Sequence, residues 1–151
     1  KENNIQSTVV CPSGFFSDMK DFLDMAQQGR VWLFGDGNYR LNPIDGADLA
    51  KATADSIEEG RKEVEVGGPD VFTHAELAEL AFECLEKKPR ISYVWDFFRV
   101  FLVGTIPWLA PRYISGPTEF FLTAMGMDNV GECHGSKTLR EHFVQVLKEK
   151  A

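Results

Sequence analysis

The sequence predicts an α/β fold, in which the last strands and helices of a parallel sheet are followed by a small, mostly helical lobe. Residues 1–68 alternate between short apolar, β-branched runs and helical patterns, as parallel strands joined by helices do. Residues 69–151 carry mainly helical stripes. We therefore expect an incomplete sheet domain over 1–68 and a separate lobe over 69–151.

The first strand is predicted at Thr8-Val9-Val10-Cys11, a continuous run typical of a strand buried on both faces of a parallel sheet. Pro12-Ser13-Gly14 ends it, and a helical pattern begins at Phe15. A strand so close to Lys1 would leave a sheet edge unpaired, which soluble proteins avoid. We expect a further segment, upstream or on another chain, to cover that edge.

The middle of the sequence predicts two more strands around a helix. "RVWLFGDGNYRLNPI" indicates a strand, a hairpin turn at Gly-Asp-Gly and a second extended piece. Asp45 is placed to cap the next helix, whose inner face would carry Leu49, Thr53 and Ile57. "KEVEV" indicates the following strand, and Gly67-Gly68-Pro69 a hinge turn with a positive φ at one glycine.

The later helices carry clear start signals. Thr73 with Glu76 three residues on forms a capping box, and Thr138 with Glu141 repeats the pattern at the last helix. "RISYV" indicates a strand between them. From 107 to 135 the Gly and Pro punctuation predicts irregular structure.

Charge and cysteine usage exclude several classes of protein. The formal net charge of −7 disfavours a nucleic-acid partner, because phosphate contacts need a field of Lys and Arg. Cys11, Cys84 and Cys133 are far apart, without a C-x-x-C pair, which favours a reducing intracellular compartment and no metal site. We expect Cys11 and Cys84 to be buried as small hydrophobic residues.

The most apolar stretch, residues 94–111, is shorter than the ~20 uncharged residues of a transmembrane segment and is interrupted by charges and breakers. Its aromatic residues, Phe97 and Phe101 among them, leave three interpretations open. In the first, they line a pocket for a large apolar substrate. In the second, they pack on a missing half or a partner subunit. In the third, they contact a membrane surface.

Five segments, in order, carry a family resemblance: "CPSGFFSDM", "VWLFGDG", "NPIDGADLA", "VGGPDVFTHAELAELAF" and "HGSKTLREHF". They resemble the C-terminal half of atypical, NmrA-like short-chain dehydrogenase/reductases of the NAD(P)-binding Rossmann superfamily, and are similar to the divinyl chlorophyllide reductase branch. The resemblance spans most of the chain outside residues 95–130. It implies a Rossmann half upstream that binds the dinucleotide, and plastid location.

The resemblance also implies roles for individual residues. Pro12, Ser13, Gly14 and Phe15 would lie at the nicotinamide end of NADPH, with NADH as the alternative cofactor. Asn42, Pro43, Phe97 and Phe101 would contact a small-molecule substrate, and residues 69–151 would close over it. The protein would then be an NAD(P)H-dependent reductase of an apolar, unsaturated or carbonyl compound, inactive without its N-terminal half.

The sequence departs from the family at two places. Cys11 stands where the family commonly has an arginine, and no tyrosine is followed four residues later by lysine, so the proton donor is unknown. Glu119 and Asp128 are candidates by position only, against an ordinary surface role. The missing pair keeps open an alternative: a non-catalytic NAD(P)-sensing regulator or a structural subunit of a larger complex.

Overall fold

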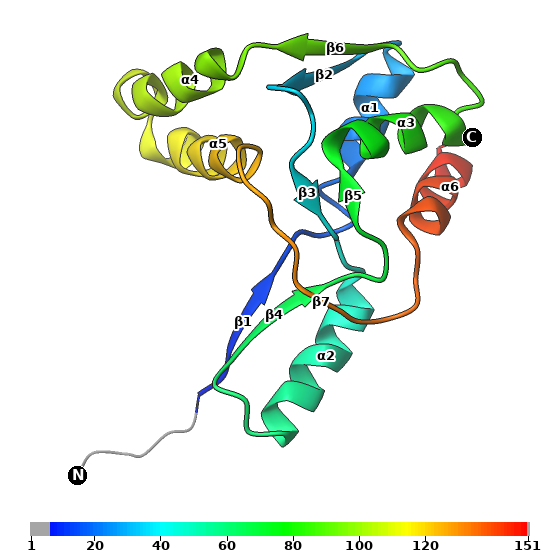
Figure 1. The fold of residues 1–151 in the computed structure, drawn as a ribbon, viewed down its shortest axis with the longest axis vertical. Coiled ribbons are helices and arrows are strands. Elements are labelled where there is room, and N and C mark those ends of the chain that lie inside the picture. The colour runs from blue at the N-terminus through cyan, green and yellow to red at the C-terminus, as the bar shows by residue number, and fades with distance from the viewer. Residues whose placement is uncertain (1–6, 151) are drawn as a thin grey trace. The chain divides into compact units, whose positions relative to one another are not determined.

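The computed structural model describes residues 7–150, which fold into two compact units. Unit 1 comprises residues 7–20, Leu41–Val71 and 130–150, and unit 2 comprises Asp21–Arg40 and Phe72–Asn129. The elements, labelled in Figure 1, are β1 (Val9–Pro12), α1 (Lys20–Gln27), β2 (Val31–Phe34), β3 (Arg40–Leu41), α2 (Gly46–Glu58), β4 (Glu63–Gly67), β5 (Phe72–Thr73), α3 (His74–Cys84), β6 (Ile91–Val94), α4 (Asp96–Leu109), α5 (Arg112–Ala124), β7 (Glu132–Cys133) and α6 (Leu139–Glu149). The predicted α/β class and the alternation of strands and helices are confirmed. The predicted division of roles at residue 68 stays a prediction.

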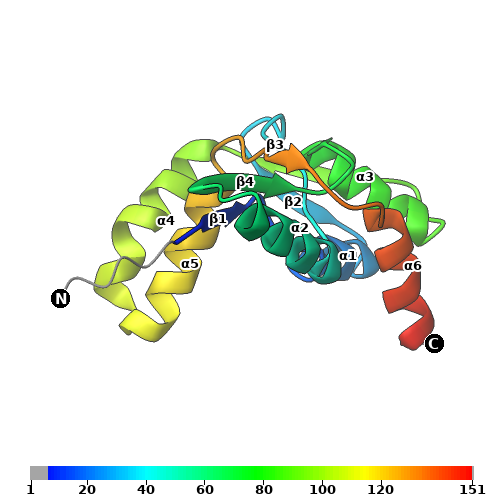
Figure 2. The same cartoon turned by 90° about the horizontal axis from the view of Figure 1, so that it is seen from below.

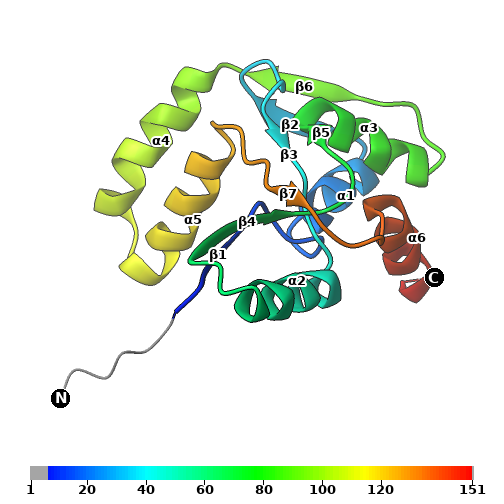
Figure 3. The ribbon, with the colours of Figure 1, turned by 60° about the horizontal axis from the view of Figure 1, so that its bottom comes forward.

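Unit 1 is built on a parallel sheet in the order β1-β4-β7. Val10 lies opposite Val64 and Pro12 opposite Val66, and β7 continues the sheet on the other side of β4. Figure 3 shows β1 and β4 side by side with α2 next to them. The core consists of Ile44, Ala52, Val64 and Val66, with Val10 and Leu49 packed against it.

The first strand is paired on one side only within the described residues, because β4 is its single neighbour in the sheet. The expectation of burial on both faces is therefore wrong: Val9 and Cys11 are exposed, and Val10 and Pro12 are half-buried. The alternation is that of an edge strand with one covered face. Cys84 is half-buried, not fully buried.

The small residues of α2 form its buried face. Ala52 and Ser56 are buried, whereas Ile57, predicted on the inner face, is exposed. Ser56 also satisfies its hydroxyl locally by donating to the carbonyl of Ala52 at 2.7 Å. Side chains this small let the helix approach the sheet closely. The spacing of the larger residues Leu49, Thr53 and Ile57 therefore predicted the wrong face of the helix at Ile57.

Unit 2 contains a second parallel pair, β2 with β6, in which Val31 lies opposite Ile91. The predicted hairpin is wrong, because β2 pairs with a strand sixty residues later in the chain and not with β3. The turn itself is present, with positive φ at Gly35 and Gly37. Most buried hydrophobic side chains of the unit come from α1, β2 and α3, and α5 adds Leu122: Phe22, Leu23, Ala26, Val31, Leu33, Leu77, Ala78, Leu80, Ala81, Phe82 and Leu122.

The predicted irregular segment after residue 107 instead contains the end of α4 and the whole of α5. Pro107 lies in the last turn of α4 and Pro117 inside α5, although each removes a backbone donor from its helix and crowds the carbonyl four residues earlier. The two helices pack on each other as a hairpin, seen clearly in Figure 2. Contact between helices thus overrides the breaker residues. No helix within residues 7–150 combines the length and apolar character needed to cross a bilayer.

Local start signals predicted the helix N-termini correctly where a side-chain cap exists. Asp45 caps α2 by accepting from the backbone N–H of Ala47, and both predicted capping boxes are present, at Thr73 and Thr138. The exception is α1, which begins at Lys20 instead of Phe15. Residues 16–19 form turns, and Phe15 makes an isolated parallel bridge with Ile44.

Candidate functional site

The turn after β1 is fixed onto the segment that follows β3. Ser13 extends the β1–β4 ladder by donating its N–H to the Val66 carbonyl at 2.9 Å, and its buried hydroxyl donates to the Asn42 carbonyl at 2.5 Å. The Gly14 carbonyl accepts from the N–H of Ile44 at 2.9 Å. The structure therefore brings together the predicted cofactor residues Pro12–Phe15 and the predicted substrate residues Asn42 and Pro43.

Phe15 is the most accessible residue of this turn, next to the half-buried Gly14. Gly14 has φ +146°, a conformation that L side chains rarely adopt, so glycine is needed here. The Phe15 side chain is 37% exposed although its backbone is bridged to Ile44. A rigid backbone carrying a partly exposed aromatic ring at the carboxyl end of a parallel strand is suited to stacking on a planar ligand.

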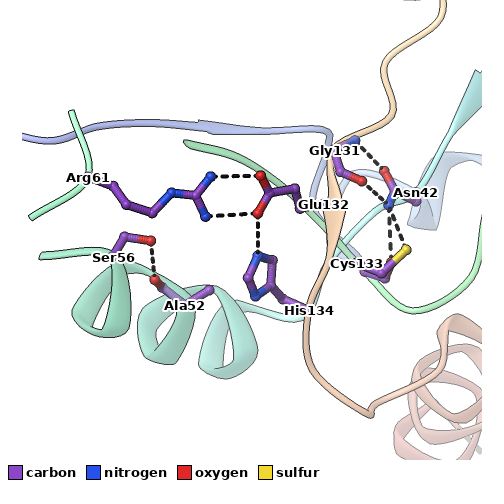
Figure 4. Close-up of polar contacts among 9 residues, drawn as sticks. Asn42, Ala52, Ser56, Arg61, Gly131, Glu132, Cys133 and His134 are labelled. Atoms are coloured by element: carbon purple, nitrogen blue, oxygen red, sulfur yellow. Dashed lines mark hydrogen bonds and ion pairs between the residues drawn. The ribbon is translucent and has the colours of Figure 1, made fainter. Parts of the chain in front are cut away.

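Asn42 is completely buried, and its side-chain amide bonds to two separate segments of unit 1 (Figure 4). Its Nδ2 donates to the carbonyls of Gly68 at 3.1 Å and Gly131 at 3.0 Å, and its Oδ1 accepts from the N–H of Gly131 at 2.9 Å. The Sγ of Cys133 lies 3.8 Å from the same Nδ2. Both amide hydrogens are thus directed at backbone carbonyls. Direct substrate contact by Asn42 stays a prediction, whereas its bonding to the frame is observed.

Three glycines make room for this arrangement. A Cβ on Gly67 would collide with the Asn42 amide, one on Gly68 with the Pro43 carbonyl, and one on Gly131 with the backbone of Val66. Neither Gly67 nor Gly68 has a positive φ, so the predicted reason for this glycine pair is wrong. Close approach between backbone and side chain requires them. We refer to Asn42, Gly67, Gly68 and Gly131 together as the asparagine joint.

Charged pairs surround the joint at the surface of unit 1. Arg61 donates to both carboxylate oxygens of Glu132, at 2.8 and 2.7 Å, and His134 Nε2 lies 3.8 Å from Oε2 of the same carboxylate (Figure 4). The hydrogen bond from Arg61 lowers the pKa of Glu132 below its ordinary value. This pair ties the start of β4 to β7. Sequence reasoning missed it because the partners are seventy-one positions apart.

Lys137 and Asp45 form a second pair, with Nζ and Oδ2 3.0 Å apart. Burial raises the pKa of Asp45, but the hydrogen bonds from Lys137 and from the Ala47 N–H outweigh it and lower that pKa overall. Asp48 accepts from the N–H groups of Ser136 and Lys137, at 3.1 and 3.2 Å. Both aspartates therefore have the structural role of anchoring the segment before α6. Among residues 7–150 no three His, Cys, Asp or Glu side chains gather as a metal ion would require.

The remaining predicted substrate residues lie in unit 2. Phe97 and Phe101 are exposed on α4, and the Phe97 ring stacks at a tilt on Phe98, with centroids 4.5 Å apart. Between them Arg99 is held by Asp96, at 2.6 and 3.0 Å, and donates to the Leu122 carbonyl of α5 at 3.0 Å. The hydrogen bond that Arg99 donates to Asp96 lowers the pKa of Asp96.

Of the two carboxylates considered as proton donors, Asp128 is engaged with Arg40. It accepts from the Arg40 backbone N–H at 2.9 Å and from the guanidinium at 3.0 Å. The backbone bond is the main cause that lowers the pKa of Asp128, which favours its ionised form over a proton-donating acid. Glu119 lies half-buried on α5. Neither is established as a catalytic group.

Comparison with known proteins shows a partial relationship. No family model matches the chain. The mitochondrial NADH dehydrogenase [ubiquinone] 1 alpha subcomplex subunit 9 of Arabidopsis thaliana is 31% identical over 94 residues, covering 55% of this chain and 23% of that protein. The chain thus matches less than a quarter of this curated relative.

A solved structure shares the fold. The GDP-mannoheptose C4 reductase MlghC from Campylobacter jejuni, determined with NADP bound, superposes with a TM-score of 0.50 and 9% identity over 95% of this chain and 48% of that one. Together with the parallel pairing of β1, β4 and β7, this match identifies the architecture as part of a Rossmann-like α/β fold.

Proposed function

We propose that this chain is the C-terminal portion of an NAD(P)H-dependent reductase, of the NmrA-like type, that acts on an apolar, unsaturated or carbonyl compound. The observation that carries the proposal is the turn after β1. A glycine with φ +146° and a partly exposed Phe15 stand at the carboxyl end of a parallel strand, which is where open α/β sheets bind ligands. The NADP bound to the structurally similar reductase supports a nicotinamide cofactor.

The residues of the turn fit the nicotinamide end of such a cofactor. The bound nicotinamide would supply a hydride. Gly14 would let the backbone approach the ring, and Phe15 would stack on it and exclude water. The asparagine joint would hold this turn in position through the Asn42 carbonyl, which accepts from Ser13. The ribose and pyrophosphate contacts would come from an N-terminal Rossmann half that pairs with the open side of β1.

A titration of the full-length protein with NADPH and with NADH tests this function. Replacing Phe15 by Ala is expected to weaken binding of the preferred cofactor by a factor of about 2 to 13, which corresponds to ~0.5–1.5 kcal/mol of aromatic stacking. The control is Ile57→Ala, since Ile57 is exposed on α2 and should leave the affinity unchanged. Equal affinity in the Phe15 variant and the parent would contradict the assigned turn.

The need for an N-terminal half in cofactor binding is tested separately. NADPH should raise the melting temperature of the full-length protein and leave that of the 151-residue chain unchanged. A shift for the 151-residue chain alone would contradict the need for an N-terminal half.

A second candidate is a non-catalytic NAD(P)-binding subunit of a larger complex. The similarity to the mitochondrial NADH dehydrogenase subunit and the absent Tyr-x-x-x-Lys pair favour it. The two candidates differ in turnover: a reductase oxidises bound NADPH when substrate is added, whereas the subunit retains it unchanged and co-purifies with other chains. An organelle is the proposed location, the mitochondrion following the relative and the plastid following the divinyl chlorophyllide reductase resemblance.

A further inference from the structure

The turn between α4 and α5 carries three of the four most exposed large hydrophobic side chains of the described residues. Trp108 is 89% exposed, Leu109 82% and Tyr113 78%, the same value as for Trp95 at the other end of α4. We call Trp108, Leu109 and Tyr113, with Arg112, the hairpin tip. No residue of α4 is buried, so the helix leaves a continuous apolar surface that leads to this tip. An exposed apolar surface of this kind marks an interaction site.

The tip lies at the far end of its hairpin. Because α4 starts immediately after β6 and contains fourteen residues, its last turn is about 20 Å from the end of that strand. Figure 3 shows the two helices side by side, joined at that far end. The inner face of α5 buries Ser115 and Leu122. Packing within the hairpin therefore leaves the tip side chains outside.

Charge separates this hairpin from the rest of the chain. The net charge of the chain is −7, whereas the hairpin has no net charge, because Arg99 and Arg112 balance Asp96 and Glu119. Both carboxylates lie away from the tip, since residues 97–118 contain neither Asp nor Glu. Of the two arginines, Arg99 is neutralised by Asp96 at the base of the hairpin. The other, Arg112, opens α5, whose N-terminus has no side-chain cap. An uncapped helix N-terminus and a guanidinium favour a negatively charged partner.

We propose that the hairpin tip inserts into the interfacial region of a lipid bilayer, with Trp108 and Leu109 among the acyl chains and Arg112 at anionic headgroups. Tryptophan and tyrosine prefer this depth because their rings are apolar with one polar edge. The tip concentrates its apolar groups at an extremity beside a cation, whereas a protein interface places aromatic groups centrally within a polar rim. Phe97 and Phe101, in the first half of α4, lie outside the tip and stay available for the substrate contact that the family resemblance implies.

Tryptophan fluorescence of the full chain, as its gene encodes it, tests the insertion. The 151 residues contain Trp32, Trp95 and Trp108, so replacing every other tryptophan of the full chain by Phe, Trp32 and Trp95 included, leaves Trp108 as the single reporter. Vesicles of phosphatidylcholine and phosphatidylglycerol should shift its emission to the blue and make it accessible to nitroxide-labelled lipids. An unchanged spectrum would overturn the proposal.

Vesicle sedimentation with matched variants identifies the residues responsible. Trp108→Ser should lower the partition coefficient about tenfold or more, since a large apolar side chain no longer leaves water. Trp32→Ser, which removes an exposed tryptophan of β2, should leave it unchanged. Arg112→Gln should lower it about fivefold on mixed vesicles, matching ~1 kcal/mol per basic residue, and leave it unchanged on phosphatidylcholine alone.

The alternative occupant gives a different result. If the full chain self-associates in solution, and Trp108→Ser abolishes that association while vesicle binding is absent, the tip is a protein interface and the membrane proposal is wrong. Equal losses for Trp108→Ser and Trp32→Ser would also overturn it. Nicotinamide binding plays no part in these measurements, so their failure leaves the proposed function intact.

Discussion

The asparagine joint of unit 1 and the α4–α5 hairpin of unit 2 differ in how closely their side chains are packed and bonded within their own unit. In the joint a completely buried amide directs its donors at backbone carbonyls, and three glycines leave no room for a methyl group. In the hairpin α4 buries nothing, and a Cβ added to Gly104 or Gly116 would meet no atom within 4 Å. The joint finds its partners within unit 1, whereas the hairpin leaves an apolar surface exposed.

The same substitution, glycine to alanine, should therefore have opposite effects in the two regions. The largest effect is expected at Gly68, because a methyl group there would collide with the Pro43 carbonyl, which is backbone and cannot rotate away. Gly68→Ala should destabilise the protein by about 3 kcal/mol or more. Urea unfolding measures this loss, and an unchanged midpoint would mean that the joint is looser than described.

Removal of the joint amide should have the next largest effect. Asn42→Leu leaves the Gly68 carbonyl and the Gly131 N–H and carbonyl without their side-chain partner, and each unpaired buried group costs ~1–3 kcal/mol. We expect a loss of about 3 kcal/mol in unfolding free energy. The matched control is Asn38→Ala, whose exposed amide bonds only to Asp36 in the described residues and should change stability by less than ~0.5 kcal/mol. Similar losses for both variants would contradict the role of the joint.

Unit 2 contains a buried polar group that is not satisfied in this way. His74 Nδ1 is buried without a hydrogen-bond partner, and burial lowers the pKa of His74 below 6.5, with Asp128 opposing the shift. At pH values between the lowered pKa of His74 in the folded protein and its ordinary pKa in the unfolded chain, the unfolded chain binds the proton more tightly. Stability is therefore fully present above about pH 6.5, falls as the pH drops toward the folded-state pKa, and levels off below it.

Unfolding free energies measured from pH 7.5 to pH 5 check this linkage. For one group the slope cannot exceed ~1.4 kcal/mol per pH unit. His74→Leu should flatten the dependence of unfolding free energy on pH. It should change stability little at neutral pH, because Nδ1 of His74 has no hydrogen-bond partner to lose. A residual slope is expected from His142, whose pKa burial also lowers. A variant curve as steep as that of the parent would contradict the assignment.

The smallest effect, and the one of opposite sign, is expected in the hairpin. Gly104→Ala in α4 should stabilise the protein by about 0.5–1 kcal/mol, because alanine has the higher helix propensity and its methyl group meets no neighbour. The unfolding midpoint should rise slightly. A loss of stability comparable to that of Gly68→Ala would show that the hairpin is packed against another surface after all.

The sequence by itself determined the features that depend on neighbouring residues. Asp45, Thr73 with Glu76 and Thr138 with Glu141 start helices where predicted, since a cap needs only a side chain and the N–H groups of the next turn. The alternation of strands and helices followed from periodicity. The glycine turn at Pro12–Phe15 was also found in this way, and its function stays a proposal.

Only the tertiary structure decided the features that join distant segments. Asn42 meets Gly68 and Gly131, twenty-six and eighty-nine positions away, and β2 pairs with β6 across a parallel crossover. The exposure of Cys11 depends on β1 being an edge strand, and α5 forms through Pro117 because it packs on α4. Propensity acts over a few residues and is worth fractions of a kcal/mol per position, so packing between distant segments overrides it.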